Sequence, residues 1–383
     1  MLNNDNSDKF FKENISEHLS SYTICIVTQN NTYMVIHKLD EENDTHLDID
    51  KNNIYFFNTK EELTDILEEV FDDIHFPNNI SLSYSTMGDA NTDIISHGKY
   101  IFITKLIKGV YSKYEKKVKF DSAEYIIYDI LAKKSDKELE RLKLIASITD
   151  RILEETFKHI KIGYTELDIA NLTQKCSNDI MKLYVGSNDI VSYDMAWENC
   201  PIVLTGQNLE KGGHSLPSDK KLQKGDTIYF DFGIKVDFKD NTSLYTDMQR
   251  MGYALKDQTV PKEVEKVFDT LVSAIEDGID EMRPDIKGYE IDEIVRGKIL
   301  KEGYPDYPHA TGHPVGRNVH DIGAIISVRG SKRSKMKLVE NGVYTLEPRI
   351  NIPNGGSIEE MIQVTKYGGI PLCNTQKKLY IVK

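Results

Sequence analysis

The sequence predicts a two-domain protein of the α/β (α+β) class. Its 383 residues exceed the usual length of a single domain. Short β-type runs and amphipathic helical stripes are interspersed along the chain, which is typical of mixed helix and sheet. A long helical stripe begins after residue 135, so we place a smaller domain at residues 1–130 and a larger one at residues 135–383.

Composition and charge restrict the partners. The net charge of −13 at pH 7 disfavours binding to nucleic acid or to an anionic membrane surface. The first residues lack the basic start and apolar core of a signal peptide, and no apolar run is long enough to span a membrane. The four cysteines form no CxxC pair, so a disulfide framework is not expected. We expect a cytoplasmic protein with no nucleic-acid or membrane partner.

The first domain is predicted to be rich in strands. Residues 1 to about 20 are polar and should form a frayed end or a first helix. Asn30-Asn31 predicts a hairpin, and Thr59 with Glu62 has the spacing of a capping box before a helix. The predicted strands cover residues 22–27, 32–37, 53–57 and 80–85. No catalytic constellation is found here, so we expect this domain to serve packing, oligomerisation or one wall of a site.

The second domain opens with helices. Ser135 and Glu138 form a capping box before a long amphipathic stripe that ends at Gly163. Residues 160–169 resemble residues 286–294, and each segment opens a helix after a long helical pattern. The echo indicates either a duplicated half-domain or chance similarity.

Strands, glycines and histidines dominate the last part of the chain. Segments 226–233 and 248–255 are predicted to be neighbouring strands, and segment 236–245 has the turn formers of an extended hairpin. One face of the first strand carries Thr227, Tyr229 and Asp231. The later predicted elements are a helix over 261–282, a histidine-rich loop over 309–323, and strands through Glu347 and Glu359 around a Gly355-Gly356 turn.

Four carboxylates in this region require a counter-charge. Asp231, Asp247, Glu347 and Glu359 each lie in or beside an apolar, β-rich run, where an unpaired charge is costly. Brought together they would repel one another, and two divalent cations would balance them. With His313 as a fifth ligand, the set suits manganese, cobalt, iron or zinc.

The histidines of residues 309–323 are predicted to face a cleft. His309 and His313 have the spacing of a helical zinc motif, but the Glu of HExxH is missing. Gly312 and Pro314 are incompatible with a stable helix. Together with His320, these histidines fall within 12 residues, which favours a functional loop; a buried, hydrogen-bonded histidine is the alternative for each one.

Two questions stay open at this point. Asp231 and Asp247 could each cap a turn or pair with a cation such as Arg250 instead of binding metal. Glu359 and Glu360 face opposite sides of a strand, so only one of them can face a site, and alternation alone does not decide which.

The segment from about residue 135 to 383 resembles the pita-bread metallopeptidases, the family of methionine aminopeptidase, aminopeptidase P, prolidase and creatinase. The resemblance rests on DFG and TDMQR (231–233 and 246–250), HATGHPVGRNVHDIG (309–323), LEPR (346–349) and SIEEMIQVT (357–365), in the family's order. It implies a pita-bread fold with pseudo-duplicated halves. Residues 1–130 resemble the family's smaller creatinase-type N-terminal domain.

The resemblance also implies a metal site. The ligands would be Asp231, Asp247, His313, Glu347 and Glu359, with Asp247 and Glu359 bridging two divalent cations. Manganese is the first expectation, with cobalt, zinc or iron as alternatives. A hydroxide between the cations would attack the peptide bond, and Glu347 would carry its proton to the leaving amine.

Three histidines match substrate-side positions of the family. His320 would contact the substrate carbonyl or the tetrahedral intermediate, His214 matches a substrate-side histidine, and His309 matches a histidine that lines the peptide channel. His214, His320 and Glu347 are therefore the predicted catalytic residues. The implied enzyme is an aminopeptidase acting on peptides with proline in second place. A prolidase and a non-catalytic peptide- or protein-binding module are the alternatives, and a homodimer is expected by analogy.

Three positions depart from the family pattern. Gln249 stands where threonine is common, so one hydroxyl near the ligands is expected to be missing. Arg349 stands where glycine is common, and Ser357 stands where proline-specific members usually carry arginine. The spacing between Asp231 and Asp247 is longer than usual, which we interpret as a hairpin insertion. Arg349 and Ser357 bear on Xaa-Pro specificity more than on metal binding.

Overall fold

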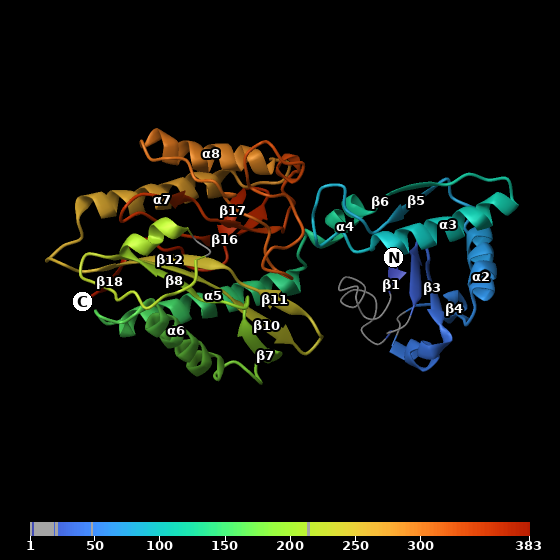
Figure 1. Ribbon diagram of the computed structural model, residues 1–383, viewed down its shortest axis with the longest axis horizontal. Coiled ribbons are helices and arrows are strands. Elements are labelled where there is room, and N and C mark those ends of the chain that lie inside the picture. Colours follow the sequence, from blue (N-terminus) through green and yellow to red (C-terminus); the bar gives the residue numbers. More distant parts are fainter. Residues whose placement is uncertain (1, 4–18, 20–21, 47–48, 213–214) are drawn as a thin grey trace. The chain divides into compact units, whose positions relative to one another are not determined.

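Figure 1 shows the computed structural model of the chain, which describes residues 2–3, 19, 22–46, 49–212 and 215–383. The chain forms two compact units, Met1–Asp129 and Ile130–Lys383. The frayed end or first helix predicted before residue 20 lies almost entirely outside the described residues. No helix in the described ranges is both long and apolar enough to cross a membrane.

The N-terminal unit contains a sheet with the order β1-β2-β3-β4 and a separate β5–β6 pair. The predicted hairpin is confirmed, because β2 and β3 pair antiparallel with Val27 opposite Thr32. Thr59 and Glu62 form the predicted capping box at the start of α2. The bounds are β1 (Leu2–Asn3), β2 (Thr23–Val27), β3 (Thr32–His37), η1 (Lys38–His46), η2 (Lys51–Asn53), β4 (Ile54–Phe57), α2 (Lys60–Asp73), β5 (Asn79–Leu82), α3 (His97–Lys113), β6 (Lys119–Ser122) and α4 (Glu124–Leu131).

Two helix pairs frame the C-terminal unit. In Figure 1, α5 and α6 lie on one side of its strands, and α7 and α8 lie on the other. Thr165 before α6 forms a β-bridge with Lys221, and Lys287 before α8 forms one with Lys337. This equivalent placement agrees with the predicted duplicated halves. The bounds are α5 (Asp136–His159), α6 (Glu166–Met181), α7 (Lys262–Glu281) and α8 (Gly288–Lys301).

The strands of the C-terminal unit form small sheets with the orders β18-β12-β9-β8, β11-β10-β7 and β13-β16-β17, and a β14–β15 pair. The predicted hairpin is confirmed, with Val236 of β10 opposite Leu244 of β11. The predicted strands include Glu347 and Glu359. In the structure, β13 ends one residue before Glu347, and β16 begins one residue after Glu359. The bounds are β7 (Ile190–Met195), β8 (Ile202–Thr205), η3 (Gly206–Lys211), β9 (Thr227–Phe232), β10 (Ile234–Phe238), β11 (Ser243–Tyr245), β12 (Met248–Ala254), η4 (Arg333–Lys335), β13 (Val343–Leu346), β14 (Arg349–Ile350), β15 (Gly356–Ser357), β16 (Glu360–Thr365), β17 (Gly368–Pro371) and β18 (Tyr380–Val382).

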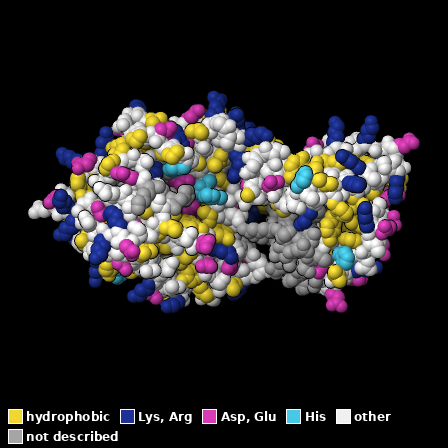
Figure 2. Space-filling view, viewed as in Figure 1, with side chains coloured by type: hydrophobic (Ala, Val, Ile, Leu, Met, Phe, Trp, Pro, Cys, Tyr) yellow, Lys and Arg dark blue, Asp and Glu magenta, His cyan; other side chains and the backbone are white. Residues whose placement is uncertain are grey.

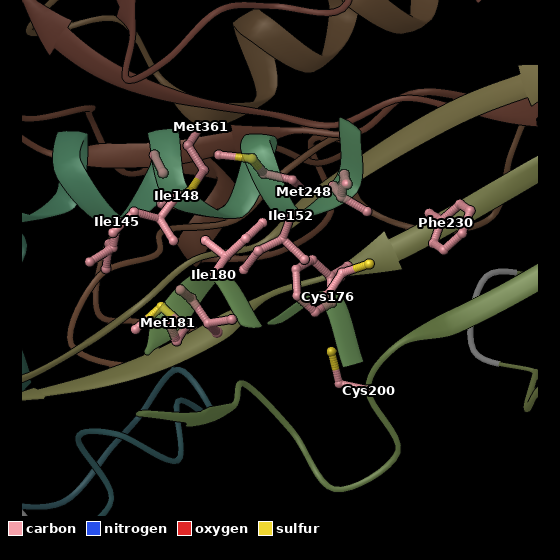
Figure 3. Close-up of a cluster of buried hydrophobic side chains, with 14 of the residues drawn as sticks. Ile145, Ile148, Ile152, Cys176, Ile180, Met181, Cys200, Phe230, Met248 and Met361 are labelled. Carbon is pink, nitrogen blue, oxygen red and sulfur yellow. The ribbon is translucent and has the colours of Figure 1, made fainter. Parts of the chain in front are cut away.

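Alternation along β9 separates the core from the functional face. Phe230 and Phe232 belong to a cluster of buried apolar side chains that also receives side chains from α5 and α6 (Figure 3). Burying one such side chain contributes about 1.5–3 kcal/mol. Tyr229 and Asp231 share the opposite face, as predicted, and their side chains are hydrogen-bonded to each other. The core therefore fixes which way Asp231 points.

Candidate metal centre

Asp231 and Asp247 are brought side by side by the pairing of β9 with β12. In this antiparallel register Met248 lies opposite Phe232, and Gln249 lies opposite Asp231. Asp247 directly precedes β12 and is therefore a neighbour of Asp231. The inserted hairpin β10–β11 pairs with β7 in a different sheet, so the longer sequence spacing leaves this register intact.

Glu359 and Glu360 are turned to opposite sides at the start of β16. The Oε2 atom of Glu360 lies 3.2 Å from Nη2 of Arg250, and the same Nη2 lies 3.0 Å from Oδ1 of Asp150. Arg250 is fully buried, so this ion-paired group belongs to the interior. Arg250 is thus engaged away from the two site aspartates, and Glu359 is the glutamate that offers its oxygens beside them.

His313 and Glu347 are fixed by backbone hydrogen bonds. The N–H of Thr345 donates to the His313 carbonyl oxygen over 2.8 Å, and the N–H of Glu347 donates to the Thr311 carbonyl oxygen over 2.7 Å. The Nδ1 atom of His313 lies 3.1 Å from the Pro314 carbonyl oxygen. This contact favours the tautomer with its proton on Nδ1, which leaves the Nε2 lone pair for a metal.

The candidate ligand atoms of all five predicted residues converge. Nε2 of His313 lies 3.5 Å from Oδ2 of Asp247 and 3.8 Å from Oε1 of both Glu347 and Glu359. Asp231, Asp247 and Glu359 offer oxygens within 4.8 Å of one another. His313, Glu347 and Glu359 form a second group of this kind, so Glu359 is common to both.

Several oxygens in this cluster have neither solvent nor a hydrogen-bond partner. Among the residues that the structure describes, they include Oδ1 of Asp231, Oδ1 of Asp247 and both carboxylate oxygens of Glu359. A buried ionised oxygen without a partner is strongly destabilising. An oxygen-rich set with one imidazole suits divalent cations, so these residues fit a metal site.

Burial raises the pKa of every carboxyl group in the cluster. It raises the pKa of Asp247 to about 7. It raises the pKa of Glu347 to about 8, opposed by His313 and reinforced by Asp247. Burial, and then repulsion from Asp247, raises the pKa of Asp231 and of Glu359 well above their usual values. The cluster therefore takes up protons near neutral pH unless cations replace them.

The three histidines assigned to the substrate side differ in placement. His320 is exposed, and the centre of its ring lies 4.3 Å from the centre of the His313 ring. With Asp247 and His313 it forms a further group that could hold a metal. His309 is half-buried, and it belongs to none of the ligand groups found in the described part of the chain. His214 lies outside the described residues. Figure 2 shows histidine beside acidic side chains at the surface of this unit.

A model of metallopeptidase family M24 matches residues 140–366, more than half of the chain. The chain belongs to metallopeptidase family M24. This match confirms the predicted family. The residues described above are therefore interpreted as the site of a metallopeptidase.

Relatives of this M24 chain have peptidase names. YkvY of Bacillus subtilis, whose assigned name proposes a dipeptidase, is 29% identical over 268 residues, which are 69% of this chain and 66% of that protein. An uncharacterized peptidase of Staphylococcus haemolyticus is 29% identical over 239 residues, which are 61% of this chain and 60% of that protein. The chain thus spans less than two thirds of the length of these relatives.

Solved structures similar to this M24 chain confirm the predicted pita-bread fold. An X-Pro aminopeptidase from Thermotoga maritima has a TM-score of 0.70 at 22% identity and covers 100% of this chain and 96% of its own. An Xaa-Pro dipeptidase from Bacillus anthracis has a TM-score of 0.69 at 19% identity, covering 99% and 94%. A prolidase from Pyrococcus horikoshii has a TM-score of 0.67 at 22% identity, covering 99% and 94%.

Two side chains that were not predicted to contact the M24 ligands do so. Nε2 of Gln249 donates to Oε2 of Glu347 over 3.1 Å, so the expected loss of a hydroxyl is offset by an amide. The Tyr229 hydroxyl donates to Oδ2 of Asp231 over 3.2 Å. The shared parity of Tyr229 and Asp231 on β9 could have revealed the second contact.

The histidine loop of the M24 chain is anchored from α8. The Thr311 hydroxyl donates to Oδ1 of Asp292 over 2.5 Å and lies 2.6 Å from the Tyr307 hydroxyl. Arg296 donates to both oxygens of Asp292, over 2.9 and 2.8 Å, and to carbonyl oxygens of the loop. Because the Thr311 carbonyl accepts from the Glu347 N–H, this network supports the metal centre. In the sequence, only the i,i+4 spacing of Asp292 and Arg296 on a helix could have indicated this network.

Proposed function

We propose that the chain is a metal-dependent aminopeptidase that hydrolyses the N-terminal peptide bond of Xaa-Pro peptides with two divalent cations. The observation that carries this proposal is the set of buried oxygens on Asp231, Asp247 and Glu359 that have no hydrogen-bond partner in the described part of the chain and lie beside Nε2 of His313. Manganese is the first expectation, with cobalt, zinc or iron as alternatives. A cytoplasmic homodimer with a peptide as its only partner completes the proposal.

The two ligand groups suggest how two cations are held. Asp231, Asp247 and Glu359 would hold one cation, and His313, Glu347 and Glu359 would hold the other. Glu359 belongs to both groups, and Oδ2 of Asp247 is 3.5 Å from Nε2 of His313. Asp247 and Glu359 are therefore the ligands suited to bridging.

The chain's own residues supply orientation and proton transfer. When bound, the cations balance the negative charge and make a water molecule acidic enough to ionise near neutral pH. Glu347 can accept that proton and pass it to the leaving amine, because Gln249 holds one of its oxygens and leaves the other directed at His313. His320 is exposed beside His313, where its imidazole can donate to the developing oxyanion.

Proline in second place is supported by the names of similar proteins. The structures with similar folds are named as an X-Pro aminopeptidase, an Xaa-Pro dipeptidase and a prolidase. In this proposal His309 lines the peptide channel and His214 contacts the substrate. A prolidase that cleaves Xaa-Pro dipeptides is the second candidate function, because the similar proteins also include an Xaa-Pro dipeptidase and a relative whose name proposes a dipeptidase.

A peptide panel tests the proposal. The protein is freed of metal, reloaded with Mn(II), Co(II), Zn(II) or Fe(II), and assayed on peptides with and without proline in second place, while its metal content is measured. We expect two cations per chain and cleavage before proline.

Asp247→Ala should abolish turnover, whereas Asp277→Ala, which changes an exposed aspartate on α7, should not. Two bound cations without cleavage of any peptide would indicate a binding module, and light scattering tests the homodimer.

A further inference from the structure

Lys134, just before α5, forms a buried ion pair with Asp321 of the histidine loop. Its Nζ atom lies 3.1 Å from Oδ2 of Asp321, and the two side chains are 0% and 1% exposed. The same Nζ atom donates to the carbonyl oxygens of Leu131 and Ala132, over 3.3 and 3.2 Å. These three oxygens match the three N–H donors of a lysine ammonium group. The lysine therefore joins the residues before α5 to the loop that carries His320.

The loop has the shape that this lysine requires. A Cβ atom at Gly316 would lie 2.5 Å from Cε of Lys134, and the φ angle of Gly316, +152°, is one that other residues rarely adopt. Because Gly316 has no side chain, the lysine can extend past it and reach Asp321.

The carboxylate of Asp321 binds the backbone on both sides of His320. Its Oδ2 atom accepts from the Arg317 N–H over 2.9 Å, and its Oδ1 atom accepts from the Ile322 N–H over 2.8 Å. Residues 315–323 contain neither helix nor strand, so no regular ladder of backbone hydrogen bonds holds His320. The position of His320 therefore depends on side-chain contacts such as these.

A second ion pair, of the opposite polarity, joins the same two segments. Nε of Arg317 lies 2.6 Å from Oε1 of Glu138, and its Nη2 atom lies 3.1 Å from Oε2. Along both segments the cation precedes the anion, and each cation pairs with the anion of the other segment. A displaced loop would bring like charges together, and such charge patterns fix the relative position of two segments.

Stability alone is a weak explanation for the buried pair of Lys134 and Asp321. Taking a lysine and a carboxylate out of water is costly, and apolar side chains of similar volume often stabilise a fold equally well. An ion pair with hydrogen bonds adds a defined geometry between its two partners. The pair is therefore better suited to positioning the loop than to stabilising the fold.

We propose that Lys134 is a positioning residue that holds His320 in place for the reaction, acting through Asp321. This inference rests on the proposed peptidase function and adds a residue that lies far from the metal ligands in sequence. His320 directly precedes Asp321, and the centre of its ring lies 4.3 Å from the centre of the His313 ring. A displacement of about 1 Å can cost about 100-fold in rate. The position of the loop thus decides whether the imidazole reaches the developing oxyanion.

The test variant is Lys134→Met/Asp321→Asn, which removes both charges together so that neither is left buried without a partner. It is loaded with metal and assayed on the most rapidly cleaved peptide of the panel. We expect kcat to fall about tenfold and KM to change less than about twofold, with two cations retained. A folded variant with the wild-type kcat would overturn the inference.

A double-mutant cycle separates the positioning of His320 from any other effect of the ion pair. His320→Ala alone should lower kcat about 100-fold. If Lys134 acts through His320, adding the two substitutions to His320→Ala should lower kcat by less than about twofold more. A further loss of about tenfold would show that the pair acts elsewhere, against the inference. If Lys134→Met/Asp321→Asn does not fold, Asp321→Asn alone is put through the same cycle, and the same two outcomes decide.

The matched control is Arg141→Met/Asp240→Asn. Arg141 also lies near the start of α5 and is 8% exposed, and it pairs over 2.9 Å with Asp240, at the turn between β10 and β11. Because this variant loses an ion pair of the same helix away from the histidine loop, its kcat should equal that of the wild type. A control whose kcat falls as far as that of the test variant would contradict a specific role for Lys134. Thermal unfolding and metal content are measured for every variant.

Failure of the proposed function has a different signature. A metal-loaded wild type that cleaves no peptide contradicts the proposed activity, whatever Lys134 does. The inference is then decided by NMR of histidine-labelled protein loaded with Zn(II), with the ring signals of His320 assigned from their loss in His320→Ala. Signals that move or broaden in Lys134→Met/Asp321→Asn, but not in the control, support the inference. Signals that stay at their wild-type positions in both variants overturn it.

Discussion

The side-chain amide of Gln249 donates to the carboxylate of Glu347, with 3.1 Å between Nε2 and Oε2. The same residue lies opposite Asp231 in the β9–β12 register, and its carbonyl oxygen accepts from the Glu359 N–H. The amide also lowers the pKa of Glu347, against the larger rise caused by burial. One residue thus supports three of the four carboxylates in the cluster.

Replacing Gln249 by leucine removes the donor while keeping a similar volume. Because Glu347 then loses the contact that fixes its orientation, we expect kcat to fall about tenfold with little change in KM. The measurement is steady-state kinetics on an Xaa-Pro peptide. The matched control is Gln223→Leu, which changes an exposed glutamine and should leave kcat unchanged. An unaltered kcat in Gln249→Leu would show that the amide has no part in orienting Glu347.

The elevated pKa values predict how the metal-free protein responds to pH. Burial raises the pKa of Asp247 from 3.8 to about 7 and that of Glu347 from 4.5 to about 8. The folded state therefore binds more protons than the unfolded state between about pH 4 and pH 8, so stability should fall as pH rises through this window. Each pH unit costs about 1.4 kcal/mol for every group that must give up its proton.

Thermal unfolding with and without a chelator measures this effect. The chelated protein should unfold at a lower temperature at pH 8 than at pH 5.5. Added Mn(II) should stabilise the protein most at pH 8, because cations replace the protons and bind only the folded site. A chelated protein that is equally stable at both pH values would contradict the assignment of these carboxylates to one buried cluster.

Local patterns in the sequence predicted those parts of the site that lie on strands. Alternation placed Asp231 on the face opposite Phe230, and turn formers between the aspartates predicted the hairpin that leaves their strands paired. Alternation also showed that Glu359 and Glu360 face opposite sides. It could not show which side is the site, because that depends on where Arg250 projects from β12.

Contacts between segments distant in sequence had no such signal. Arg250 of β12 donates a hydrogen bond to Asp150 of α5, 100 positions away in the chain. No spacing rule connects these two residues. The anchor of the histidine loop likewise joins Thr311 to Asp292 of α8. Such partners are set by tertiary packing, which local periodicity does not encode.

The anchor of the histidine loop is tested by Thr311→Val. Valine keeps the shape of threonine but removes the hydroxyl that contacts both Asp292 and Tyr307. We expect a loss of about 2 kcal/mol in stability, since two buried polar groups lose a partner. Denaturant unfolding measures this loss, and kcat/KM should fall with it because the loop carries His313.

A buried threonine away from the site provides the comparison for Thr311→Val. Thr270 on α7 donates its hydroxyl to the Lys266 carbonyl oxygen. Thr270→Val should leave kcat/KM unchanged whatever its effect on stability. If both variants have wild-type activity, the anchor contributes to folding but not to positioning the metal centre.

Glu359 and Glu360 should respond in opposite ways to the same substitution. Glu359→Gln removes one of four mutually repelling carboxylates, so the metal-free protein should become more stable at pH 8 while metal binding and activity are lost. Glu360→Gln removes an anionic partner of the fully buried Arg250 and should cost about 3 kcal/mol of stability. It should nevertheless keep two cations per folded chain. Metal analysis and chelated unfolding on the two variants provide the comparison, and a Glu359→Gln protein that binds metal normally would mean that the site uses other ligands.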